Sequence, residues 1–101
     1  MRLTEHQRRI IQEAAKDLFG GDAEVRVFGS RADDSARGGD IDLLIKTRLN
    51  EADAVVRAEL AFQARLQEAL GEQKIDVLVD YPGRQYYPPV YEVAERTGVP
   101  V

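Results

Sequence analysis

Cysteine is absent from this 101-residue chain, which excludes disulfide bonds and thiolate chemistry and leaves nothing to indicate an oxidising compartment. A surplus of basic residues is also missing, because 14 Lys and Arg stand against 18 Asp and Glu. The net charge of −4 argues against non-specific nucleic-acid binding, which depends on cations that displace phosphate counterions. The same acidic balance is compatible with a group of carboxylates that holds a metal ion.

Long apolar runs are lacking as well. No segment has the length needed to span a bilayer, and residues 1–6 do not form the apolar core of a signal peptide. The expected location is therefore the cytoplasm, with no membrane partner. The only histidine, His6, lies near an expected helix start and is assigned no functional role.

The residues that are present describe a globular protein. The chain is 44% hydrophobic and 32% charged, which is unlike a disordered tail. Its length leaves no room for two cores of ordinary size, so residues 1–101 are expected to form a single domain.

Apolar spacing predicts three helices and three strands. The helices are expected over residues 5–19, 51–70 and 90–97, and the strands over residues 23–28, 40–46 and 74–80. Thr4 and Gln7 form a capping-box pattern at the first helix, and Asn50 is a candidate cap for the second. A loop with one helical turn after Ser30 is expected over residues 30–39.

The connections predict how the strands pair. The link between the first two strands is near the lower limit for a parallel crossover, so an antiparallel pair is favoured. The helix between the second and third strands favours a parallel pair. The predicted fold class is therefore α+β, a small mixed sheet with helices packed on it.

Asp40-Ile41-Asp42 opens the second strand and is the first candidate for chemistry. Two acids two residues apart on a strand point to the same face, where their charges repel. Asp76 lies in the third strand, and on a neighbouring strand its Cβ atom would lie roughly 5 Å from that of Asp40 or Asp42. Three carboxylates on a rigid sheet suit Mg²⁺ or Mn²⁺. The alternative is that all three are ordinary solvated acids, although Asp is disfavoured within strands.

Gly29-Ser30 follows the first strand directly and is a candidate phosphate cradle. Free N–H groups at such a turn can bind a phosphate, and the Ser30 hydroxyl can donate to it. Taken alone, a Gly-Ser pair is equally typical of a simple turn. Arg31 is a candidate partner for a phosphate or for Asp33.

Taken together, Gly29-Ser30, Asp40-Ile41-Asp42 and a later Asp76 resemble the nucleotidyltransferase signature of the DNA polymerase beta superfamily. The short chain and its Gly-Ser-Arg-Ala stretch are most similar to the minimal nucleotidyltransferases of bacteria and archaea. The resemblance implies a divalent metal held by the three acids and phosphates held at Gly29 and Ser30. It further implies transfer of a nucleotidyl group from ATP or another NTP, with Asp76 helping to activate an acceptor hydroxyl.

Several members of that family act as the antitoxin partner of a helical HEPN-domain toxin, some by adenylylating a tyrosine on it. The resemblance therefore implies a HEPN-type protein, or a second copy of this chain, as the partner that completes the site. A non-catalytic module that neutralises a partner by contact is the alternative function. A regulatory domain unrelated to nucleotides would leave the spacing of these motifs unexplained.

All four tyrosines lie between Tyr81 and Tyr91. Tyr and Arg are enriched where proteins bind one another, so this segment is a candidate interface. The alternative is that the rings pack over the sheet as part of the core.

Overall fold

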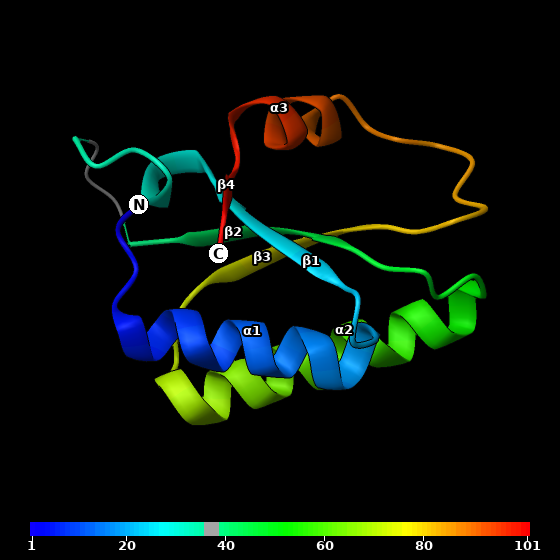
Figure 1. Ribbon diagram of the computed structural model, residues 1–101, viewed down its shortest axis with the longest axis horizontal. Coiled ribbons are helices and arrows are strands. Elements are labelled where there is room, and N and C mark those ends of the chain that lie inside the picture. Colours follow the sequence, from blue (N-terminus) through cyan, green and yellow to red (C-terminus); the bar gives the residue numbers. More distant parts are fainter. Residues whose placement is uncertain (36–38) are drawn as a thin grey trace.

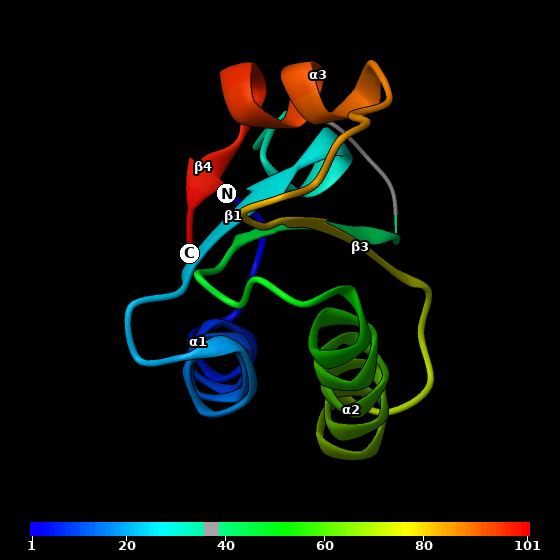
Figure 2. The same cartoon turned by 90° about the vertical axis from the view of Figure 1, so that its right-hand side faces the viewer.

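A computed structural model describes residues 1–35 and 39–101, and the elements form three layers. Helices α1 (Glu5–Phe19) and α2 (Ala52–Leu70) cover one face of a sheet, and α3 (Val90–Thr97) covers the other (Figure 2). All three helices were predicted. In the described part of the chain, no helix is long and apolar enough to cross a membrane.

The sheet contains β1 (Glu24–Phe28), β2 (Ile41–Lys46), β3 (Ile75–Asp80) and β4 (Val99–Pro100), in the order β3-β2-β1-β4 (Figure 1). The strand β1 is antiparallel to β2 and β4, whereas β2 and β3 are parallel. The predicted mixed α+β fold and both predicted pairings are therefore confirmed. The short strand β4 was not predicted.

Burial on both faces explains the apolar character of β2. Ile41, Leu43 and Ile45 point toward α1 and α2 and are fully buried. On the opposite face, Leu44 forms a second small core with Phe28 and Ala94 beneath α3. On that same face, the first residue that β2 contributes is Asp42, and the first that β3 contributes is Asp76. Neither is part of a core.

The predicted capping box begins α1. The Gln7 N–H donates to Thr4 Oγ1 at 3.0 Å, and the Thr4 N–H donates to Gln7 Oε1 at 2.9 Å. The cap predicted for α2 is wrong, because this helix begins at Ala52 and its N-cap residue is Glu51, which makes no side-chain cap bond. Asn50 belongs to the preceding loop, where its carbonyl lies against the turn at Gly83.

The helical turn predicted after the first strand is a 3-10 turn, η1, over Gly29–Arg31. It is the coil beside the N-terminus in Figure 1. The loop predicted over residues 30–39 includes residues 36–38, which lie outside the described residues.

Phe62 provides a test of the main core. It is fully buried in α2, and its ring meets that of Phe19 edge-on, with centroids 5.6 Å apart. We expect Phe62→Ala to lower the free energy of unfolding by about 3–5 kcal/mol, because it leaves a cavity between the two helices. The matched control is Leu60→Ala on the same helix, since Leu60 is 67% exposed. Urea unfolding of both variants gives the comparison, and equal losses would contradict this packing.

Candidate functional site

Asp42 and Asp76 lie side by side at the beginning of the two parallel strands. They are direct partners in the register of β2 and β3, and both point to the face that carries α3. Asp42 is also the register partner of Phe28, the last residue of β1. Parallel pairing of two strands that each begin with an Ile-Asp step therefore brings together acids that are 34 positions apart in the sequence.

The acids in this pair perturb one another. Partial burial, a hydrogen bond with Asp76 and the negative charges of Asp76 and Asp40 all raise the pKa of the Asp42 carboxyl above its ordinary value. The positive charge of Lys74 opposes the shift. A hydrogen bond between two carboxyl groups requires that one of them be protonated. Burial, the hydrogen bond and the neighbouring charges therefore all favour the protonated form of the Asp42 carboxyl.

Asp40 lies beside this pair and has a different partner. Its carboxylate is 3.8 Å from Lys74 Nζ, and its side chain is 53% exposed. The N–H of Ile41 donates to the carbonyl of Lys74, so the residues preceding β2 and β3 run next to each other. Lys74 was not predicted as a site residue. Its position two residues before Asp76, the same spacing as Asp40 before Asp42, was the available signal.

Gly29, the first residue of η1, lies against Asp42. Its φ is +68°, a value that glycine adopts readily and residues with a side chain rarely adopt. A Cβ atom at this position would overlap Asp42 Oδ2. The absence of a side chain therefore lets the backbone of the turn approach the Asp42 carboxylate, so the two predicted halves of the site meet here.

Ser30 and Arg31 follow Gly29 in the turn. The carbonyl of Ser30 accepts a hydrogen bond from Arg2 Nη2 at 3.1 Å. The Arg31 guanidinium donates through Nη1 to the carbonyl of Arg2 at 2.8 Å and through Nη2 to the carbonyl of Gly39 at 3.1 Å. Arg31 thus holds backbone on both sides of the turn, a set of contacts that the sequence did not predict.

A divalent metal was expected at the three acids. Across residues 1–35 and 39–101, no three His, Cys, Asp or Glu side chains are arranged closely enough to form a metal-binding group. The chemistry of Asp42 and Asp76 nevertheless fits a hard cation, because two oxygen-donating carboxylates are direct partners in the register of β2 and β3 and their charges repel. Asp40 is near enough for its charge to act on Asp42, although its oxygen faces Lys74.

The tyrosine-rich segment is ordered around one arginine. The Arg84 guanidinium carbon lies 5.6, 5.5 and 4.7 Å from the ring centroids of Tyr81, Tyr87 and Tyr91. The Tyr87 hydroxyl donates to Asp80 at 2.6 Å, and this bond raises the pKa of Tyr87 to about 12. Tyr86 is 70% exposed. Three rings therefore pack around Arg84, and Tyr86 is the ring most available to a partner.

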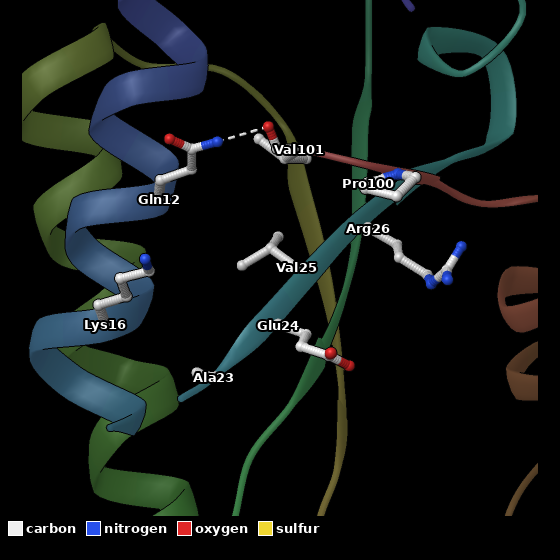
Figure 3. A pocket seen from close by; sticks show the side chains of 8 residues that line it. All are labelled: Gln12, Lys16, Ala23, Glu24, Val25, Arg26, Pro100 and Val101. Carbon is white, nitrogen blue, oxygen red and sulfur yellow. Dashed lines mark hydrogen bonds between the residues drawn. The ribbon is translucent and has the colours of Figure 1, made fainter. Parts of the chain in front are cut away.

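A cavity of about 300 Å³ lies away from the acids, between α1, β1 and the C-terminal residues Pro100 and Val101 (Figure 3). Gln12 in its wall donates a hydrogen bond to the carbonyl of Val101. The cavity contains none of the predicted site residues. Its lining consists of Gln12, Lys16, Ala23, Glu24, Val25, Arg26, Pro100 and Val101.

Comparison with known proteins identifies a family for most of the chain. The model of a protein family described as a nucleotidyltransferase domain matches residues 8–98. The matched range contains Gly29, Asp42 and Asp76. It also contains every described helix and strand except the first three residues of α1 and the whole of β4. A search of curated proteins found no match to the chain.

Gly29→Ala tests the close approach of the turn to the acids. We expect a loss of about 1–2 kcal/mol in unfolding free energy from the left-handed backbone alone, and a further loss from displacement of Asp42. Gly21→Ala is the control, because Gly21 has no atom within 4 Å of an added Cβ. Urea unfolding measures both, and a Gly29→Ala variant as stable as Gly21→Ala would contradict the geometry.

Asp42→Asn tests the cost of a charge at Asp42, which arises from partial burial and from its acidic neighbours. The folded-state pKa of Asp42 is raised above 3.8, so its favourable contribution is complete below pH 3.8 and is lost as the pH rises through the raised value. Asn carries no charge, so the variant should be more stable than the original chain at pH 7 in EDTA. The gain should shrink as the pH approaches 4.

The measurement is urea unfolding between pH 4 and 7, with Glu72→Gln as the control at an exposed acid between α2 and β3. A gain that is independent of pH, or that appears equally in Glu72→Gln, would refute an unfavourable charge at Asp42.

Proposed function

Because this chain belongs to the nucleotidyltransferase domain family, we propose that it transfers a nucleotidyl group, AMP from ATP, to a hydroxyl acceptor. Membership supports nucleotidyl transfer in general, and the choice of ATP and of a hydroxyl is our own. The observation that carries the proposal is the meeting of Asp42, Asp76 and the backbone of Gly29 at one end of the sheet. A simple structural turn would have no need for two acids in register beside it.

In the proposed reaction, the acceptor hydroxyl oxygen attacks the α-phosphorus of ATP. A new P–O bond forms, the bond between the α-phosphorus and the bridging oxygen breaks, and pyrophosphate leaves with that oxygen. Asp76 accepts the hydroxyl proton, a task suited to a carboxylate exposed at the edge of the site. The turn at Gly29 and Ser30 holds the phosphates next to Asp42.

Mg²⁺ or Mn²⁺ is the proposed cofactor, held by Asp42 and Asp76, with Asp40 joining them when it leaves Lys74. When bound, such a cation would neutralise charge on the phosphate oxygens. Its charge would also offset the repulsion between Asp42 and Asp76. The site residues proposed for catalysis and metal binding are therefore Asp40, Asp42 and Asp76.

The acceptor is proposed to come from a second protein. Asp40 and Asp76 are both exposed. This accessibility supports a macromolecular hydroxyl, such as a tyrosine of a helical HEPN-type partner neutralised by an antitoxin. A second copy of the chain is the other proposed partner. Both proposals follow the narrower resemblance to minimal nucleotidyltransferases.

The test is incubation with ATP and Mg²⁺ in the presence of the protein encoded by the neighbouring gene. ATP labelled at the α-phosphorus should transfer its label, and ATP labelled at the γ-phosphorus should not. Asp42→Asn should reduce transfer by a factor of about 10² or more, because it removes a carboxylate from the reacting centre. Asp53→Asn, an exposed acid in the first turn of α2, is the control.

The outcomes separate the two candidate functions. Transfer that depends on Asp42 and not on Asp53 supports the enzyme. An absence of transfer together with tight, nucleotide-independent binding of the neighbouring protein would replace it with a non-catalytic module that acts by contact. Transfer of the γ-label would identify a phosphoryl transferase instead.

A further inference from the structure

The hydrogen bonds of Arg31 assign it to a different task from the phosphate binding that its position in the sequence suggested. We propose that Arg31 and Arg2 form a clamp that positions the Gly29–Ser30 turn relative to the acids of β2. Its effect on transfer rests on the proposed function, whereas the clamp itself can be tested without any activity. Arg31 is a positioning residue here, because it acts on the backbone of the site.

The guanidinium of Arg31 bridges two segments. Nη1 donates to the carbonyl of Arg2 at 2.8 Å, and Nη2 donates to the carbonyl of Gly39 at 3.1 Å. The side chain is half-buried, and its Nε is enclosed away from solvent. Binding a phosphate in this arrangement would require the side chain to give up two charge-assisted hydrogen bonds.

Arg2, in the N-terminal segment, donates hydrogen bonds to the backbone in and after the turn. Its N–H donates to the carbonyl of Arg31 at 2.7 Å, its Nη2 donates to the carbonyl of Ser30 at 3.1 Å, and its Nε donates to the carbonyl of Asp33 at 3.4 Å. Each arginine therefore binds the backbone of the other or of its neighbours. This reciprocity distinguishes a clamp from a single surface contact.

The bond to Gly39 connects the clamp with the acids. Gly39 directly precedes Asp40, so Arg31 sets the distance between the turn after β1 and the beginning of β2. Gly29 must stay close to Asp42 for the backbone to reach the carboxylate. A shift of about 1 Å in such a geometry can lower a rate by a factor of about 10².

Only arginine can make this bridge. Its planar guanidinium presents several N–H donors in a fixed fork, whereas the ammonium of lysine is a single point on a flexible chain. Arg31→Lys keeps the positive charge and loses the double contact. A phosphate ligand and a clamp therefore respond differently to the same conservative change.

The first experiment is amide hydrogen exchange of the full chain without nucleotide. The N–H groups of Ala32 and Asp33 donate to Gly29 and Ser30 within the turn, so their protection reports its order. In Arg31→Ala, Arg31→Lys and Arg2→Ala, both amides should exchange at least about tenfold faster. Each substitution removes charged hydrogen bonds that join the turn to neighbouring segments. Arg57→Ala, at an exposed arginine of α2, should leave them unchanged.

The second experiment measures Mg²⁺·ATP affinity and kcat on the same variants at a temperature where each is folded. The clamp predicts that Arg31→Lys loses as much kcat as Arg31→Ala, and that the losses in Arg31→Ala and Arg2→Ala are less than additive when combined. A direct phosphate contact predicts rescue by Arg31→Lys and no effect of Arg2→Ala. Unchanged exchange at Ala32 and Asp33 would overturn the clamp even if transfer itself is confirmed.

Arg2→Ala keeps the proposal testable if the Arg31 variants do not fold. The Arg2→Ala substitution removes the side-chain hydrogen bonds to Ser30 and Asp33, while the backbone carbonyl of residue 2 remains available to Arg31. If no variant transfers AMP because the proposed function is wrong, the exchange experiment still decides for or against the clamp.

Discussion

Two like charges held in register are the constraint on which this molecule depends. Asp42 and Asp76 are fixed opposite each other because the strands that carry them are parallel neighbours, each buried on both sides further along. Partial burial, the hydrogen bond between them and their repulsion together raise the Asp42 pKa, so a charged Asp42 is unfavourable at this end of the sheet. Sites that bind charged substrates commonly have such perturbed groups, because the ligand relieves what the fold imposes.

The rest of the structure supplies the rigidity that this arrangement requires. The α1 and α2 helices bury one face of β2, and α3 buries the middle of the other through Leu44 and Ala94. The acids lie just beyond that second core. A strand anchored on both faces cannot slide by one residue without moving every buried side chain to the wrong face, so the register of the acids is protected by the core.

The elements that were predictable carry their signals locally. The apolar period of α1 and its Thr4–Gln7 cap are contained within one segment, and so are the alternating residues of β2 and β3. The contacts that escaped prediction join distant segments: β4 pairs with β1 through Val27 and Val99, and Lys74 reaches Asp40. Asn50 illustrates the limit differently, because its side chain suits a helix cap, but the loop beside Gly83 places it outside the helix. The partners of Arg31 were not predictable, because they depend on where the N-terminal segment and Gly39 lie.

The exposure of Asp40 and Asp76 has a consequence for the fate of a bound nucleotide. Water is itself a hydroxyl donor at about 55 M, and an open rim does nothing to keep it from the phosphorus. A chain of this shape gains selectivity for an acceptor only when the acceptor's own surface displaces that water. The fidelity of transfer over wasteful hydrolysis would then depend on how completely the surface of the acceptor covers this rim.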